Sequence, residues 1–421
     1  MAVSQYFDRG RLARIADGLV VAVAVSLPWS TSATGILIVL WLLAFIPTID
    51  AATLRREALT WAGGLPVLLW LLAAVGMLWT DASLNERLGG LLGFHRLLVI
   101  PLLLAQFRRS ENGNSVLLGF LASAVLLLLV SGIHAALFFD VPQSPRFFPG
   151  VPVKDYIAQS LIFAICIFAL LGIAVEAWRA GRHWWALGLV LLALMFLADI
   201  AYIATGRTAL VVIPVLAVLF GFRQVGWKGL IAASMATAGI AVVLWASSPY
   251  LRARVDRAYE DLQAYEANDV ATSNGLRLEF WRKSLGFLVQ APVFGHGTGS
   301  INGEFRSAPI GTENGVTIYS ENPHQQVLAV AIQLGLVGVG LLIAMWAAHA
   351  ALFSGPGLLS WIGLIVVAQN VVASQFNSHL FDFTLGWLYV FGVGVIGGMV
   401  RSAQPAPANA AQPVERAAPA Q

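Results

Sequence analysis

Apolar segments long enough to cross a membrane recur along the whole of this sequence. Twelve of them, uncharged or nearly so, lie at 15–29, 33–49, 62–79, 90–106, 115–139, 156–175, 184–203, 208–222, 228–246, 324–348, 357–377 and 381–400. A helix needs roughly 20 apolar residues to cross the hydrocarbon core of a bilayer. Of the 421 residues, 58% are hydrophobic and only 11% are charged, unlike a soluble domain. The sequence therefore predicts an all-α polytopic membrane protein with about twelve transmembrane helices.

Basic residues in the short connections indicate the orientation of the chain. With a cytoplasmic N-terminus, thirteen Lys and Arg residues fall on the cytoplasmic side: Arg9, Arg11, Arg14, Arg55, Arg56, Arg108, Arg109, Arg179, Arg182, Arg223, Lys228, Arg401 and Arg416. Apart from one long loop, the opposite side has five: Arg87, Arg96, Arg146, Lys154 and Arg207. Because cytoplasmic loops are enriched in Lys and Arg, we expect both termini in the cytoplasm and an even number of spans. The basic residues are spread along the chain, so the net charge of +3 gives no reason to expect nucleic-acid binding.

One connection is much longer than the others. It divides the chain into nine spans within 1–246, an outer loop at 247–323, three spans within 324–401, and an Ala/Pro/Gln-rich tail at 402–421 that we expect to be disordered in the cytoplasm. A loop of this length is usually functional. Two stretches of it, 250–269 and 275–289, have the spacing of amphipathic helices that lie on a membrane surface.

Common kinds of cofactor site have little support in this sequence. Gly295, Gly297 and Gly299 form a GxGxG string, but no strand precedes it, so a flexible turn is expected instead of a dinucleotide site. There is neither a Walker A sequence nor a DxD pair, and no two of the seven histidines lie four residues apart on one expected helix. We therefore expect neither a metal site nor a cofactor.

Polar residues at the ends of the apolar segments gather on the outer side of the membrane. They are Arg96, Arg146, Lys154, Arg207, Arg277, His324, His379 and Asp382. Each alone has a structural alternative, such as an arginine that extends to lipid headgroups, an interfacial histidine or a helix cap. Together they suit an anion at the membrane surface, such as the phosphate or pyrophosphate of a lipid. A transporter would be expected to have polar or broken segments near the midplane, where these spans have almost no charge.

Three sequence blocks resemble a known family. They are "TGRTAL" at the start of a span, "LRLEFW" followed by "APVFGHGTG", and "NPHQQVLAVAIQLGLVG". These blocks are similar to those of the O-antigen ligase and polymerase superfamily of bacterial inner-membrane glycosyltransferases, whose last block has the form Asn-x-His followed by a Gly-rich helix. The resemblance extends to about twelve spans, the large periplasmic loop before the tenth span and the cytoplasmic termini.

This resemblance implies a ligase at the periplasmic face. It would move a glycan from an undecaprenyl-pyrophosphate carrier to lipid A–core oligosaccharide among the membrane lipids. The family's essential residues fall on Arg207, Arg277 and His324, although Arg282 lies only five residues after Arg277. We further expect the substrates to be bound by a supporting set of residues: Arg96, Arg146, Lys154, Arg282, Asn322, His379 and Asp382.

The chemistry can also be argued from the residues. Cleavage of an anomeric C–O bond to pyrophosphate requires stabilisation of the negative charge on the leaving group, by a metal ion or by cationic side chains. Without a metal motif, Arg207 and Arg277 would serve, with Arg96 or Lys154 in support. His324 suits the general base that deprotonates the acceptor hydroxyl. Direct attack on the face opposite the leaving group would invert the anomeric centre.

Three other functions remain open at this stage. An O-antigen polymerase would use the same donor and a carrier-linked acceptor. A protein O-oligosaccharyltransferase would use a protein acceptor, although such proteins often have a larger C-terminal periplasmic part. The non-enzyme alternative is a transporter of lipid-linked glycans.

Overall fold

The computed structural model describes residues 8–142, 147–247, 252, 256, 260, 273–309, 311–313, 316–318, 320 and 322–403. The elements before the long loop are α1 (Arg9–Ser26), α2 (Thr31–Phe45), η1 (Ile46–Thr48), α3 (Ala51–Ala58), α4 (Trp61–Gly76), α5 (Leu84–His95), η2 (Arg96–Leu98), α6 (Val99–Phe107), α7 (Gly113–Leu137), α8 (Tyr156–Arg179), α9 (His183–Tyr202), α10 (Arg207–Val225) and α11 (Trp227–Ser247). Those that follow are α13 (Ser273–Gln290), α14 (Ile301–Ser307), β1 (Gly311–Glu313), β2 (Val316–Ile318), α15 (Gln326–Leu352), α16 (Leu358–Ala373) and α17 (Phe383–Ser402).

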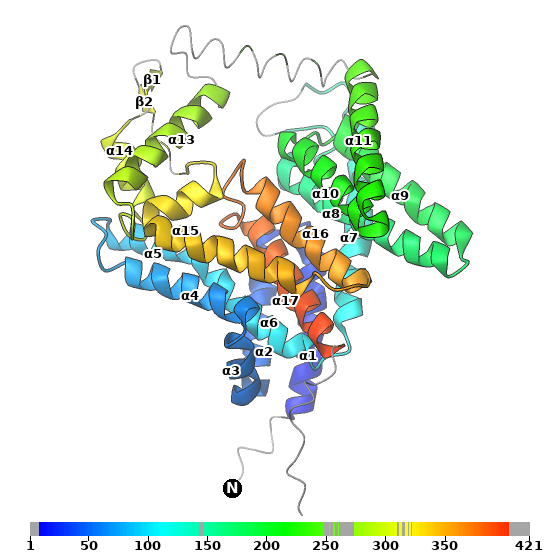
Figure 1. Ribbon diagram of the computed structural model, residues 1–421, viewed down its shortest axis with the longest axis horizontal. Helices are drawn as coiled ribbons and strands as arrows, with labels where there is room; N and C mark the ends of the chain where they lie inside the picture. Colours follow the sequence, from blue (N-terminus) through cyan, green and yellow to red (C-terminus); the bar gives the residue numbers. More distant parts are fainter. Residues whose placement is uncertain are drawn as a thin grey trace, which may run out of the picture.

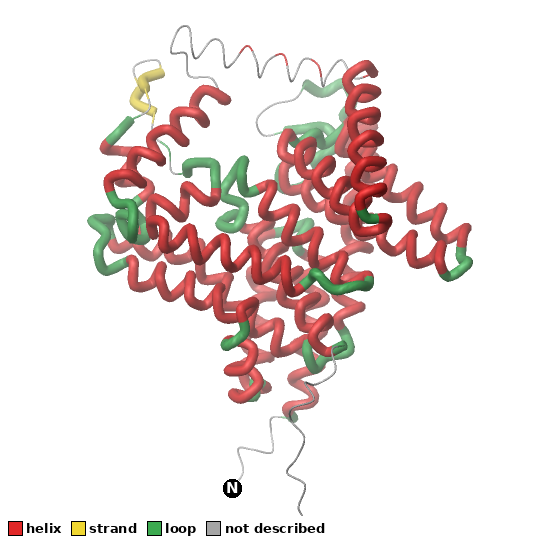
Figure 2. The backbone as a smooth tube through the Cα atoms, viewed as in Figure 1, coloured by secondary structure: helices red, strands yellow, loops and turns green. Residues whose placement is uncertain are grey.

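Some of the expectations fall outside these residues. They are Arg146, most of the expected amphipathic stretch 250–269, and positions 404–421 of the expected tail. The second amphipathic stretch lies within α13. A short antiparallel hairpin, in which Gly311 pairs with Ile318, was not expected from the sequence; it is the yellow element in Figure 2.

The expected fold class, an all-α polytopic membrane protein, is confirmed. Nine helices in the described residues are long and apolar enough to cross a membrane, and a bent pair, α3 with α4, would make a tenth. Each of the twelve apolar segments coincides with a helix, yet the expected number of spans is not reached. The reasons are physical: α1 begins with basic residues, α4 meets α3 at a bend of 83°, and α16 has only 16 residues.

The centre of the molecule is formed by α8 and α17. In each of them 83% of the spanning residues are buried, against 6% in α11. Figure 1 shows α1 beginning and α17 ending at the lower end of the bundle, whereas α13 and the hairpin lie at the upper end. The two described ends of the chain therefore lie on the same side of the molecule.

Aspartate caps define where the two central helices begin. Oδ1 of Asp155 accepts hydrogen bonds from the backbone N–H groups of Ile157 and Ala158 at the start of α8, both at 2.9 Å. Oδ1 of Asp382 accepts one from Leu385 at the start of α17, at 2.8 Å. Such caps satisfy amide groups that have no partner within the helix. They also fix the residues just before each helix.

Helix α15 is broken at Gly335, whose φ of +59° and ψ of −161° are not helical. The backbone of residues 292–297 fills the break. The N–H groups of His296 and Gly297 donate to the carbonyls of Ile332 and Gln333 at 2.8 and 2.9 Å. In return, the N–H groups of Leu336 and Val337 donate to the carbonyls of Pro292 and Val293, at 2.8 and 3.2 Å. Backbone groups released by the break are thus paired within the protein, as a membrane environment requires.

The glycine string at 295–299 is a closely packed turn, so the expectation of a flexible turn was wrong. Gly297 has a φ of +89°, and a Cβ added there would lie 2.7 Å from the carbonyl oxygen of Gly76. Only glycine allows the backbone to approach α4 so closely in this conformation. The sequence pattern therefore reflects backbone packing against α4 and α15.

Candidate active site

His324 lies in a polar turn just before α15, in a conformation that is unusual for its residue type. Its φ is +54°, and among the described residues other than glycine only Lys154, with a φ of +57°, shares a positive value. This region is disfavoured for residues with a Cβ, and such strained conformations cluster at functional sites. Both residues belong to the set expected from the sequence.

Asparagine side chains hold His324 in place. Its backbone N–H donates to Oδ1 of Asn322 at 2.9 Å, and Nδ2 of Asn322 donates to Oδ1 of Asn377 at 3.2 Å. The hydroxyl of Ser378 donates to Oδ1 of Asn322 at 2.7 Å. Asn377 and Ser378 belong to residues 374–382, which connect α16 to α17 and are called the α16–α17 turn below.

This network also determines which ring nitrogen of His324 is protonated. The backbone N–H of Ser378 donates to Oδ1 of Asn377 at 2.9 Å, which identifies that atom as the oxygen. Nδ1 of His324 lies 3.1 Å from the same oxygen. Since a carbonyl oxygen can only accept, Nδ1 must donate, and in the neutral ring Nε2 keeps its lone pair. The arrangement therefore suits a base that acts through Nε2.

Helix α13 covers one face of the imidazole. The ring of Phe280 stacks on that of His324, with centroids 5.6 Å apart and planes inclined by 29°. Arg277 lies three residues before Phe280, on the same side of α13. Burial, then the charge of Arg277, lowers the pKa of His324, whereas the hydrogen bond to Asn377 raises it. The net shift is downward, so the neutral imidazole persists to lower pH than in a free histidine.

Arg207 and Arg277 are brought together from α10 and α13. Burial, followed by the positive charge of Arg207, lowers the pKa of Arg277, while Tyr156 raises it. Arg207 is exposed at the first position of α10, and Arg277 is half-buried. Two guanidinium groups that repel one another are stabilised by a shared anion.

His379, in the α16–α17 turn, is the most enclosed of the expected residues. It is 1% exposed, and neither ring nitrogen meets a hydrogen-bonding partner among the described residues. Burial lowers its pKa to about 4, while Asp155 raises it and Arg277 lowers it. The same arginine thus influences both imidazoles, so His379 lies within electrostatic reach of Arg277.

Lys154 and Arg96 both anchor the start of α17. Nζ of Lys154 donates to Oγ1 of Thr384 at 2.9 Å and to the carbonyl of Leu27. Burial lowers its pKa to about 8, against the opposing charges of Asp382 and Asp155. The guanidinium of Arg96 donates to the carbonyl of Phe381 at 3.1 Å and to that of Asp382. These contacts hold the α16–α17 turn against η2 and the loop before α8.

Two expected residues are not placed with this group. Arg282 is exposed and lies 3.9 Å from Glu279 on its own helix, and Arg146 lies outside the described residues. Sequence reasoning missed Phe280 and Asn377. The one available signal was the polar string "SQFNSH", 374–379, between two apolar segments.

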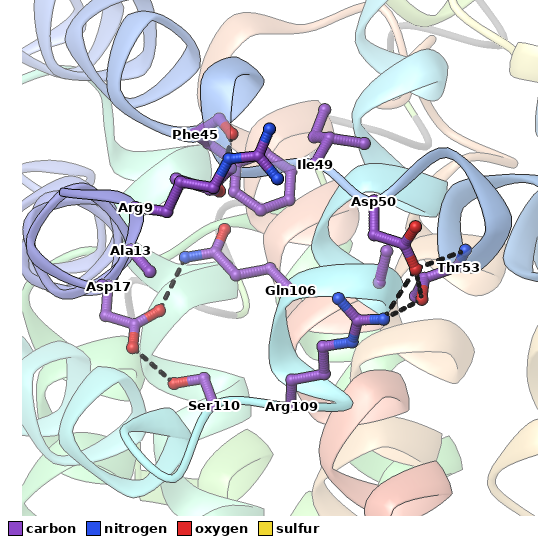
Figure 3. A pocket seen from close by; sticks show the side chains of 13 residues that line it. Arg9, Ala13, Asp17, Phe45, Ile49, Asp50, Thr53, Gln106, Arg109 and Ser110 are labelled. Carbon is purple, nitrogen blue, oxygen red and sulfur yellow. Dashed lines mark hydrogen bonds and ion pairs between the residues drawn. The ribbon is translucent and has the colours of Figure 1, made fainter. Parts of the chain in front are cut away.

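The opposite end of the molecule has a cavity of its own, of about 340 Å³, lined by both apolar and charged side chains. Figure 3 shows Asp17 within it, which accepts hydrogen bonds from Gln106 and Ser110, both at 2.7 Å. Arg109 forms an ion pair with Asp50 at 2.9 Å nearby. These pairs join α1, α3 and α6. They lie where α1 begins, away from His324.

Comparisons with known proteins bear on the same region. Residues 192–343 match the family model described as O-antigen ligase. The match is confined to this segment and supports a relationship to the O-antigen ligase and polymerase superfamily. The segment contains Arg207, Arg277, Asn322 and His324, whereas the α16–α17 turn lies beyond it. The contacts that anchor the α16–α17 turn therefore come largely from outside the matched segment.

One relative is an uncharacterised protein from Haemophilus influenzae. It is 30% identical to this protein over 131 residues, which are 30% of this chain and 33% of the relative. The match thus spans about a third of the relative's length. Among the described residues, no group of three or more His, Cys, Asp or Glu side chains is placed to hold a metal ion.

Proposed function

We propose that the protein is an O-antigen ligase that transfers a glycan from undecaprenyl pyrophosphate to lipid A–core oligosaccharide. The observation that carries this proposal is the convergence of His324, with Nε2 available as a base, and two arginines whose charges act on one another. The superfamily match supports an enzyme of ligase or polymerase type. We place the reaction at the periplasmic face of the bacterial inner membrane, with both chain termini in the cytoplasm.

Arg207 and Arg277 are proposed to bind the pyrophosphate of the donor. Negative charge grows on the leaving oxygen as the anomeric C–O bond breaks, and two fixed guanidinium groups stabilise it. Undecaprenyl pyrophosphate then departs with the bonding electron pair. Lys154, just before α8, adds a further positive charge while it holds Thr384 at the start of α17.

His324 is proposed to be the general base. The acceptor hydroxyl attacks the anomeric carbon from the face opposite the leaving group and gives its proton to Nε2, so that the centre inverts. Asn377 holds the Nδ1 proton and stabilises the imidazolium that forms. The lowered pKa of His324 keeps the ring neutral, and therefore basic, at pH 7.

A transporter fits the fold less well than an enzyme does. Broken helices in transporters present free backbone groups to a substrate or ion. The break in α15 instead has four backbone hydrogen bonds to residues 292–297. This feature supports an enzyme at the helix ends over a pathway through the bundle. Polymerase and protein O-oligosaccharyltransferase activities differ from ligase activity in the acceptor, so an experiment that offers all three acceptors distinguishes them.

The test is an acceptor competition with purified protein in detergent and EDTA. Labelled undecaprenyl-pyrophosphate glycan is offered lipid A–core, a second carrier-linked glycan, or an acceptor protein. We expect the label to appear on lipid A–core, and Arg277→Ala to lose this activity while Arg282→Ala, on the same helix, keeps it. Extension of the carrier-linked glycan would replace ligase by polymerase, and label on the protein would indicate a protein O-oligosaccharyltransferase. Absence of product with every acceptor would contradict all three enzyme activities.

A further inference from the structure

A second cavity, with a mixed apolar and polar lining, lies beside the candidate active site and has no assigned role in the reaction described above. Its volume is about 600 Å³, and this open cavity is lined by α5, the start of α14, Gln333 of α15 and Phe381. This volume lies within the range of small-molecule sites. The α16–α17 turn links the two places, because it holds His324 through Asn377 and contributes Phe381 to the cavity wall.

Glycines on α5 shape this cavity. A Cβ on Gly90 would lie 2.6 Å from the backbone N of Gly299, and one on Gly93 would lie 3.1 Å from the ring of Phe381. A Cβ on Gly89 would meet nothing within 4 Å. Gly89 therefore borders open space. Gly90 and Gly93, in contrast, allow Gly299 and Phe381 to pack close to α5.

The lining has hydrogen-bonding groups with little net charge. Asn85 and Asn302 each present an amide, which can donate and accept. The carboxylate of Glu86 is paired with Arg306 at 3.0 Å. Neutral groups of this kind suit the hydroxyls of a sugar, which also donate and accept. They differ from the paired arginines on the other side of the turn, which suit a phosphate.

Arg96 forms part of the cavity wall and fixes Phe381 beside it. Its side chain lines the cavity and the residue is 5% exposed. The terminal nitrogens donate to the carbonyls of Phe381 and Asp382, but Nε has no hydrogen-bonding partner among the described residues.

We propose that this cavity binds the sugar of the acceptor whose hydroxyl His324 deprotonates. The inference rests on the proposed ligase function. Attack opposite the leaving group requires donor and acceptor to approach from different sides. In Figure 1, α5 and α14 lie at the left of the molecule, and α10, which begins at Arg207, lies well to the right of them. A donor held by Arg207 thus leaves the α5 side to the acceptor.

Gly89→Leu tests this assignment. The new side chain enters open space, and leucine favours a helix more than glycine does, so the variant should fold. Two quantities are measured: binding of free core oligosaccharide without donor, by saturation-transfer NMR, and the KM values for acceptor and donor in the transfer assay. We expect oligosaccharide binding to be lost and the acceptor KM to rise at least about 10-fold, with donor KM and kcat unchanged.

Gly188→Leu is the matched control, because a Cβ on Gly188 of α9 also meets nothing within 4 Å and lies away from the cavity. Asn302→Ala only removes atoms, and should raise the acceptor KM several-fold even if Gly89→Leu does not fold. A donor KM that rises while the acceptor KM stays constant would assign the cavity to the donor glycan and overturn the proposal. Unchanged oligosaccharide binding in both variants would overturn it as well. A last outcome separates the two proposals. If wild type binds the oligosaccharide and the Gly89→Leu and Asn302→Ala variants do not, but wild type transfers no glycan, the binding site stands and the ligase function fails.

Discussion

The polar turn before α15 combines a strained backbone with a defined proton position. His324 has a positive φ, and Asn322 and Asn377 together hold its backbone and its ring. The blocks around Arg207, Arg277 and His324 could be found in the sequence. Asn377 could not, because it lies 53 residues away and meets the ring only in the folded protein.

The pH dependence of transfer should follow from the surroundings of His324. A base works when neutral, and the pKa of His324 is lowered from the ordinary 6.5. We therefore expect kcat/KM to be level near pH 7 and to fall only at a pH below 6.5. Arg277 helps to lower this pKa, so Arg277→Gln should move the acid limb to higher pH as well as reduce the rate. In the control, Arg282→Gln, the acid limb of the kcat/KM profile should stay at the wild-type pH. If the acid limb also stays there in Arg277→Gln, the effect of Arg277 on the pKa of His324 is contradicted.

The geometry of the cationic group at position 207, and not only its charge, should also matter. If its guanidinium binds two oxygens of a phosphate at once, a lysine cannot replace it. We expect Arg207→Lys to lose transfer about as completely as Arg207→Ala, measured as initial rates at saturating acceptor. Full activity in the lysine variant would mean that a single positive charge is enough.

At the scale of elements, α15 departs most from what its sequence suggests. Its 27 residues read as one apolar span, yet the helix breaks at Gly335 and residues 292–297 complete its hydrogen bonds. Hydropathy predicts which segments are helical, because that depends on local composition. It does not predict which loop fills a break, because that depends on contacts between distant parts of the chain.

Substitutions in the glycine turn should therefore destabilise the fold. Gly297→Ala adds a Cβ that clashes with α4 at a φ of +89°, and a residue strained in this way costs of order 1–3 kcal/mol. We expect a lower midpoint of thermal unfolding in detergent. The control is Gly286→Ala in α13, where a Cβ meets nothing within 4 Å and alanine favours the helix. Equal midpoints for the two variants would show that the turn tolerates a side chain.

At the scale of the whole molecule, the two described chain ends lie opposite α13 and the candidate active site. Glu57, which is fully buried, binds Arg108 at 2.7 Å and also Arg401, so α3, α6 and α17 are joined at the end where the chain begins. Charge asymmetry in the loops predicts this end to be cytoplasmic. The sequence could predict such an orientation from charge counts, but not the convergence of α8, α10, α13 and α15 at the other end.

Thiol labelling tests the orientation directly. The only cysteine, Cys166, is buried, so wild type should give little background with a membrane-impermeant maleimide. Ser307→Cys in α14 should react in intact inner-membrane preparations that expose the periplasmic face, whereas Glu111→Cys, between α6 and α7, should react only after permeabilisation. The reverse pattern would invert the topology and place the site in the cytoplasm.

The central claim is that His324 removes the acceptor proton while Arg207 and Arg277 stabilise the departing pyrophosphate. Its most direct test is the turnover of purified wild type and His324→Ala in EDTA, with undecaprenyl-pyrophosphate glycan as donor and lipid A–core as acceptor. General-base catalysis contributes about 10²- to 10⁴-fold, so we predict a loss of that order in the variant with donor binding nearly unchanged. A His324→Ala enzyme that turns over at the wild-type rate would contradict the account.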